Sequence, residues 1–220
     1  LGDEVFRQHG FDEWVSIEDG YRKYYSPERD GSTRSDYFHF LLQNGYTPDV
    51  ETDDGPGVFS RPFAAHLPEE FTKAHFVADR SIDFIQRHQD SPFVLFSQFL
   101  EPHMPFFGPR DDQYDAEAVP LPESFDDDLE DLPLKVRLFH RSYRERGHSG
   151  LELKESKAWR EIISRYWGLV SMVDTQIGRI LEALRTSNAA DSTIVVFTSD
   201  HGDMMGAHGL LGKCVMFEEA

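Results

Sequence analysis

The 220-residue sequence is poor in cysteine and in positive charge, and it has no long apolar run. Its single cysteine, Cys214, excludes an internal disulfide and any zinc site built from several cysteines. The 22 lysines and arginines are outnumbered by 40 aspartates and glutamates, which gives a net charge of −18. Such a charge argues against a nucleic-acid-binding surface, because that surface needs basic patches. A membrane span would need roughly 18 consecutive apolar residues. We therefore expect no nucleic-acid partner and no membrane span.

The composition is otherwise that of a globular chain. Hydrophobic residues make up 39% of the sequence and aromatic residues 13%, including 18 phenylalanines, which is too apolar for a disordered segment. The length suffices for one sizeable core or for a large part of a bigger domain. Cys214 is predicted to be a small packed residue beside a loop; the alternative, a nucleophile, has no evident base nearby. Composition leaves the oligomeric state open.

Two short apolar runs are predicted to be strands of one sheet. Residues 193–198 (TIVVFT) and 93–100 (FVLFSQFL) are the continuous runs that a strand buried on both faces requires. A helix is predicted before each run, over 68–89 and 155–186, where apolar residues recur at helical spacing. Helix, turn and strand thus occur twice, which predicts an α/β fold with a largely parallel central sheet flanked by helices. Another short helix is expected at about 34–44, within a region read mostly as loop.

Polar side chains follow both predicted strands. Asp200 and His201 come directly after the second, with His208 and Lys213 further along a loop rich in Gly and Met. After the first, His103 lies in a Pro-His-Met-Pro segment, where the prolines restrict the backbone. Open α/β sheets bind ligands at the carboxyl ends of their strands. We therefore predict that His103, Asp200, His201 and Lys213 line one cleft. The alternative is a set of polar loops that cap the strands.

An acidic run at 126–131 also invites a calcium-binding interpretation. It lacks the glycine and the alternating ligand spacing of an EF-hand loop. A solvated acidic loop is the favoured reading of this run.

These motifs resemble a known family. The segments Ser199-Asp200-His201-Gly202-Asp203 and Gly206-x-His208-Gly209, with Lys213 after them, resemble the second metal-binding signature of the sulfatases, which belong to the alkaline-phosphatase superfamily. Residues 102–106 resemble the sulfatase Pro-His-x-Pro-Phe segment. The resemblance implies an alkaline-phosphatase-like fold that is incomplete at both ends. Residues 1–220 would form an internal segment of a single sulfatase catalytic domain.

The resemblance also implies a role for each site residue. Asp200 and His201 would bind a divalent cation, for which Ca²⁺ is the usual metal of the family and Mg²⁺ or Mn²⁺ the alternatives. Lys213 would hold the sulfate oxygens, and His103 would serve the ester oxygen as a general acid. His208 is a further candidate for the substrate pocket. The nucleophile would be a formylglycine made from a Cys or Ser upstream of this sequence, so the segment alone is expected to be inactive.

The expected function is hydrolysis of sulfate esters, with a sulfated carbohydrate or a small organic sulfate as substrate. One alternative is a phosphonate monoester hydrolase or phosphodiesterase of the same superfamily. Another is a non-catalytic, calcium-dependent carbohydrate-binding protein, which would keep the metal without the nucleophile. The resemblance favours a periplasmic or secreted protein, although nothing in the sequence identifies the compartment.

Overall fold

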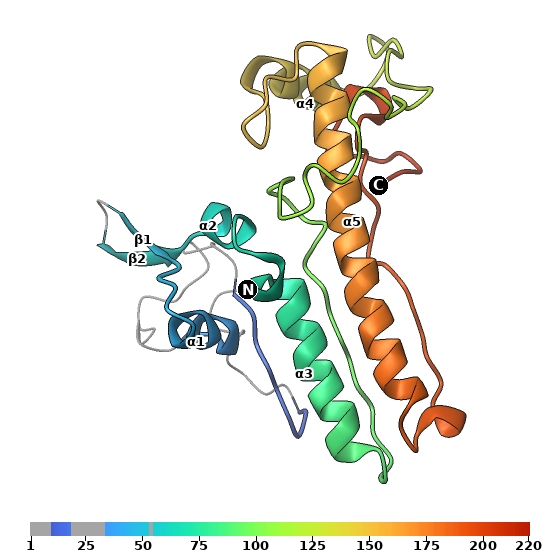
Figure 1. Cartoon of the computed structure of the whole chain (residues 1–220). Helices are drawn as coiled ribbons and strands as arrows, with labels where there is room; N and C mark the ends of the chain where they lie inside the picture. Colours follow the sequence, from blue (N-terminus) through green and yellow to red (C-terminus); the bar gives the residue numbers. More distant parts are fainter. Residues whose placement is uncertain (1–9, 19–33, 53–54) are drawn as a thin grey trace. The chain divides into compact units, whose positions relative to one another are not determined.

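A computed structural model describes residues 10–18, 34–52 and 55–220 (Figure 1). Contacts within the chain divide it into two compact units, which are described separately below. Unit 1 comprises the residues up to Glu101 together with Val173–Ala190. Unit 2 comprises Pro102–Met172 and Asp191–Ala220. No helix among the described ranges is both long enough and apolar enough to cross a membrane.

Unit 1 combines short helices with a two-stranded hairpin. The strands β1 and β2 pair antiparallel, with Asp49 opposite Phe59 and a register shift near the turn. An aromatic cluster fills the space between the helices and the hairpin, and Tyr37 at its centre is completely buried. The elements in chain order are α1 (Asp36–Gln43), β1 (Asp49–Thr52), β2 (Gly55–Phe59), α2 (Arg61–Ala65), η3 (Glu69–Phe71) and α3 (Lys73–His88).

The helix predicted over 68–89 begins later than its sequence suggests. Glu69–Phe71 forms a separate 3₁₀ turn, and α3 starts only at Lys73. The reason is Thr72, whose extended backbone breaks the helix and whose hydroxyl accepts a hydrogen bond from the His75 N–H at 3.3 Å. The helix predicted near 34–44 is confirmed as α1, which Ser35 caps in the same way. The hairpin was not predicted.

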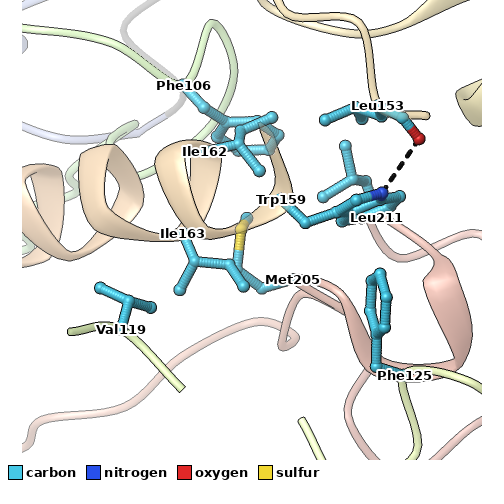
Figure 2. Packing of buried hydrophobic residues seen from close by; sticks show 9 residues of the cluster. All are labelled: Phe106, Val119, Phe125, Leu153, Trp159, Ile162, Ile163, Met205 and Leu211. Atoms are coloured by element: carbon cyan, nitrogen blue, oxygen red, sulfur yellow. Dashed lines mark hydrogen bonds between the residues drawn. The ribbon is translucent and has the colours of Figure 1, made fainter. Parts of the chain in front are cut away.

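Unit 2 is built around the first part of the longest helix, α5 (Ser156–Arg185), whose residues from Val173 onward belong to unit 1. The predicted helix over 155–186 is therefore confirmed almost to the residue. Trp159 on α5 is buried, and its indole N–H donates to the Leu153 carbonyl at 3.0 Å (Figure 2). The other elements are α4 (Leu134–Arg146), η4 (Ala190–Ser192, at the boundary of the units) and η5 (Ala207–Gly209). The core of unit 2 consists of Phe106, Val119, Phe125, Leu153, Trp159, Ile162, Ile163, Met205 and Leu211.

Neither of the two predicted sheet strands is a strand in this structure. Residues 93–100 and 193–198 run without regular secondary structure, and the sheet seen among the described residues is the antiparallel β1–β2 hairpin (Figure 1). The physical reason is that a strand forms only by pairing with another backbone. Neither segment has such a partner within the part of the chain that the structure describes. The parallel arrangement therefore stays a prediction.

Candidate active site

The loop Asp203–Gly212, just after the candidate metal ligands, is held by apolar packing and by backbone hydrogen bonds. Its apolar residues pack into two clusters of unit 2, with Met204 and Leu210 almost completely buried. The Met204 N–H donates to the Gly212 carbonyl at 2.9 Å, and the Gly206 N–H donates to the Leu210 carbonyl at 2.8 Å. These bonds bring the two ends of the loop together, so that Lys213 follows directly from a closed structure.

Asp200 and His201 lie side by side immediately before this loop. Asp200 Oδ2 is 3.4 Å from His201 Nε2, and Asp200 Oδ1 accepts the His201 backbone N–H at 3.0 Å. His201 Nδ1 is 2.6 Å from the Gly202 carbonyl oxygen, which suits a protonated Nδ1 and leaves Nε2 on the side of the carboxylate. The Asp200 side chain is 86% exposed. The pair thus offers one carboxylate and one imidazole nitrogen to solvent.

Two donors are fewer than a metal site needs. Within residues 10–18, 34–52 and 55–220, no group of three or more His, Cys, Asp or Glu side chains is arranged to hold an ion. Hard divalent cations such as Ca²⁺ take roughly six to eight oxygen ligands. The Asp200 carboxylate fits part of such an oxygen shell, whereas His201 offers an imidazole nitrogen beside it.

Lys213 and Cys214 leave the packed loop and are both exposed. Among the residues that the structure describes, the Lys213 ammonium forms no ion pair or hydrogen bond. The prediction that Cys214 is packed is wrong, because the side chains after Gly212 alternate between solvent and core: Cys214 and Met216 are exposed, whereas Val215 and Phe217 pack against the cluster of Met204 and Leu210.

His208 is engaged with protein groups. Its Nδ1 lies 2.9 Å from Asp127 Oδ2, and its ring stacks on Phe217 with centroids 4.1 Å apart and planes 18° apart. Its backbone N–H donates to the Ser124 carbonyl at 3.1 Å. These contacts join the Asp203–Gly212 loop to the acidic run and to the end of the chain. A place for His208 in the substrate pocket stays a prediction.

His103 lies in unit 2, beyond the first predicted strand. Its Nδ1 is 3.0 Å from the Met104 carbonyl oxygen, and the Met104–Pro105 peptide bond is cis. The next residue, Phe106, is buried in the unit 2 core, which anchors this segment from one side. The structure thus brings Asp200 and His201 together. Convergence of His103 and Lys213 on them stays a prediction.

Helix α4 places two side chains against the loop Asp203–Gly212. The Tyr143 hydroxyl donates to the Leu211 carbonyl at 2.8 Å, and the His140 ring lies against Gly209, where an added Cβ would come within 2.8 Å of it. Burial lowers the pKa of His140, and the nearby charge of Arg144 lowers it further. A neutral His140 is therefore favoured beside the loop.

The charge of Asp203 affects two partly buried groups of unit 2, Tyr166 and His148. Burial raises the pKa of Tyr166 to about 12, and the charge of Asp203 adds to that rise. Burial lowers the pKa of His148, against the opposing charge of the same aspartate. His148 also contacts the Ser149 hydroxyl at 2.9 Å, while that hydroxyl accepts the Phe106 N–H at 3.0 Å. The Asp203 carboxylate thus lies close enough to Tyr166 and His148 to affect the pKa of each.

The family model named Sulfatase matches residues 2–215, so the chain belongs to the sulfatase family. It is 29% identical over 218 residues to the multifunctional alkaline phosphatase superfamily protein PehA of Trinickia caryophylli, covering 90% of this chain and 41% of that protein. It is 36% identical over 155 residues to the uncharacterized sulfatase YidJ of Escherichia coli K12 (68% and 29% covered). It is 36% identical over 141 residues to human iduronate 2-sulfatase (59% and 25% covered).

A solved structure shares the fold. The phosphonate monoester hydrolase of Agrobacterium radiobacter superposes with a TM-score of 0.64 at 25% sequence identity, covering 88% of this chain and 40% of that one. The similarity supports an alkaline-phosphatase-like architecture for this chain. The chain spans at most about two fifths of the length of these relatives.

Proposed function

We propose that the complete protein containing this chain hydrolyses sulfate esters. The observation that carries the proposal is the stretch 200–213, in which an adjacent carboxylate and imidazole lead into a closed loop that is followed by an exposed lysine. The family match over residues 2–215 supports it. Two relatives are named for sulfate esters of uronic sugars, human iduronate 2-sulfatase and a Δ4,5-hexuronate-2-O-sulfatase of Bacteroides thetaiotaomicron. A sulfated carbohydrate is therefore the favoured substrate, with a small organic sulfate as the second choice.

The two site groups at 200–201 would hold a divalent cation, with Ca²⁺ favoured and Mg²⁺ or Mn²⁺ as alternatives. A carboxylate oxygen suits any of these hard ions. When bound, such an ion supplies positive charge to anionic oxygens of the substrate. The hydrogen bond from the His201 N–H to Asp200 Oδ1 holds the carboxylate beside the imidazole.

Lys213 and His103 would act on the substrate directly. Hydrolysis of a sulfate ester leaves negative charge on the non-bridging oxygens and on the departing alkoxide. The Lys213 ammonium would contact the non-bridging oxygens, and a protonated His103 would give its proton to the leaving oxygen. A formylglycine from the upstream part of the protein would serve as nucleophile. His208, which lies in the loop before Lys213, would be a further residue of the substrate pocket.

The runs 93–100 and 193–198 would be parallel strands in the complete protein, within a single sulfatase catalytic domain. Four consecutive residues of the second run, Ile194–Phe197, are 90%, 54%, 80% and 80% exposed here. Burying each would contribute roughly 1.5–3 kcal/mol. With both strands in one parallel sheet, the loops carrying His103 and Asp200 would open at the same edge.

A second candidate function is phosphonate monoester or phosphodiester hydrolysis. It is favoured by the match to PehA over 218 residues and by the fold shared with a phosphonate monoester hydrolase. The same groups would serve it, since a phosphonate monoester also carries anionic oxygens and a departing alkoxide. Relative turnover of an aryl sulfate and an aryl phosphonate monoester by the complete protein separates the two functions.

The test is substitution of Lys213 in the complete protein. Lys213→Ala should lower kcat for the better of the two esters by about 10²–10³-fold, because one charge contact in the transition state is lost. Lys157→Ala, an exposed lysine in the first turn of α5, is the matched control and should leave kcat unchanged. Asp200→Ala should remove bound metal, measured by elemental analysis of the purified protein. Normal turnover of both esters by the Lys213 variant would remove this lysine from the site.

A further inference from the structure

The side chain of Asp203 closes the loop that precedes Lys213. Its Oδ1 atom accepts two backbone hydrogen bonds, from the N–H groups of Met205 and Gly212, each at 3.0 Å. The first is local, while the second joins residues nine positions apart. Hydrogen bonds to a carboxylate are about twice as strong as bonds between neutral groups.

Hydrogen bonds hold the backbone of the two residues just before Lys213. The Leu211 carbonyl accepts from the Tyr143 hydroxyl at 2.8 Å. The Gly212 N–H donates to Asp203, and the Gly212 carbonyl accepts from the Met204 N–H at 2.9 Å. The backbone that carries Lys213 is therefore fixed, while the lysine side chain itself is exposed.

The loop needs such a restraint because much of its backbone is in the left-handed region. Left-handed φ angles are costly for residues other than glycine and persist only where surrounding contacts enforce them. Met205 has a φ of 33° and His208 a φ of 53°. The packing of Met204 and Leu210 supplies part of that enforcement, and the bond from the Met205 N–H to Asp203 acts on the strained segment directly. The five left-handed residues of the loop are Met205, Gly206, His208, Gly209 and Gly212.

We propose that Asp203 is a positioning residue, which fixes Lys213 relative to Asp200 and His201 by clamping the loop Asp203–Gly212. This inference rests on the role of Lys213 in the proposed function. Asp203 does not touch the substrate; it acts through the backbone of Gly212. A displacement of about 1 Å in a charged group costs up to about 10²-fold in rate, so the effect of the clamp is measurable in kcat.

The first experiment compares substitutions of Asp203 in the complete protein. Asp203→Ala removes the acceptor and should lower kcat by about 10–10²-fold with a smaller change in KM. Asp203→Asn keeps an acceptor oxygen without the charge and should restore kcat to within about fivefold of the wild type. Asp203→Glu keeps the charge but moves it by one methylene, so its kcat should be intermediate, and it replaces the alanine variant if that one does not fold. Glu218→Ala, an exposed carboxylate near the loop, is the matched control and should change nothing.

The second experiment tests whether Asp203 acts through Lys213. The variant Asp203→Ala/Lys213→Ala should be no slower than Lys213→Ala alone, because the clamp has no effect once the ammonium is gone. Hydrogen–deuterium exchange of peptides covering 203–213 should be faster in Asp203→Ala and near normal in Asp203→Asn. This exchange readout does not depend on activity.

The outcomes separate the two claims. Wild-type kcat in both Asp203→Ala and Asp203→Glu, with a large loss in Lys213→Ala, would overturn the clamp and leave the proposed function standing. If the loss of kcat in Asp203→Ala/Lys213→Ala equals the product of the losses in the two single variants, the clamp is overturned as well. A Lys213→Ala variant with normal turnover would overturn the proposed role of Lys213 and the positioning role with it, even if the exchange data confirm that Asp203 closes the loop.

Discussion

The two predicted strands have similar sequences but different surroundings in the structure. Along 93–99, side chains alternate between inside and outside, with Phe93 and Leu95 packed near Ile85 of α3 and with Val94 and Phe96 largely exposed. The Ser97 hydroxyl meets the Ser81 hydroxyl at 2.7 Å, which continues the inner face. Along 194–197, by contrast, every side chain is more than half exposed, on both faces.

This difference shows that an apolar sequence alone does not bury a run; burial also requires packing partners from other parts of the chain. The first run lies against a helix close to it in sequence, so one face is covered by unit 1 itself. A run that is apolar on both faces needs a sheet beside it and layers on both sides, and those contacts come from distant parts of a chain. The alternation seen over 93–99 has the period of two that an extended strand shows. The first run therefore already has strand-like side-chain positions without a paired strand.

The largest expected effect lies in the second run. If residues 193–198 become a buried strand in the complete protein, Val196→Asp and Phe197→Asp will place a charge on its two faces. Each should destabilise the complete protein by about 3 kcal/mol or more, because an unpaired charge is costly to bury. The free energy of unfolding in urea measures this for both variants.

Glu218→Gln, at an exposed position, is a control for the effect of changing surface charge. Surface substitutions normally stay within about 0.5 kcal/mol. Values that small for both aspartate variants would mean that the run is exposed in the complete protein as well, and the proposed parallel sheet would be wrong.

A moderate effect is expected on the packed face of the first run. Leu95→Ala should cost about 2 kcal/mol, at the low end for buried leucines, because Leu95 is only partly buried against the Ile85 and Leu184 cluster. Gln86→Ala, on an exposed position of α3, should stay within about 0.5 kcal/mol. Both are measured by denaturant unfolding. Equal values for the two variants would show that the packing around Leu95 does not stabilise the protein.

The smallest effect concerns Glu13, on a segment whose Phe11 ring meets Phe96 edge-on at 5.7 Å. Hydrogen bonds from Arg87, and then from His88, lower the pKa of Glu13 from 4.5 to about 2. A carboxyl with a lowered pKa stabilises the folded state above its unfolded pKa, and this stabilisation is lost as the pH falls from about 4.5 to about 2.

Glu13→Gln should therefore make the stability of the protein less dependent on pH in that window and leave the rest of the profile unchanged. Because the Glu13–Arg87 pair is exposed, the difference should be small and should shrink further in high salt. Thermal unfolding from pH 2 to pH 6 at two salt concentrations measures it. A difference that grows with added salt would contradict the ion-pair explanation.

The helices could be predicted because their signals are local. The spacing of Ala74, Ala78 and Ile85 indicated one buried face, and these residues are 0%, 0% and 2% exposed on α3. The start of α3 was predicted too early. Pro68-Glu69-Glu70 has the residues of a helix start, but it begins only a 3₁₀ turn, and Thr72 then caps α3 itself. The long α5 was found for the same reason as α3, by a stripe of apolar residues.

The candidate site could be predicted only where its parts are neighbours in sequence. The adjacent pair at 200–201 needs no folding to be close. The contact of Asp203 with Gly212, nine residues away, depends on left-handed turns that glycine permits but does not specify. The approach of His140 and Tyr143 from α4 depends on how that helix packs, which no local pattern encodes.

The burial of Trp159 gives the protein a built-in optical reporter. The chain has three tryptophans; Trp14 and Trp167 are 38% and 37% exposed, while Trp159 is 1% exposed and hydrogen-bonded within the core of unit 2. An indole in an apolar interior fluoresces at shorter wavelength than one in contact with water. Loosening of the core around Trp159 would therefore shift the emission to the red, whereas the two half-exposed indoles would change little. Emission wavelength thus reports the integrity of the core on which the loop Asp203–Gly212 rests, through Met205 and Leu211.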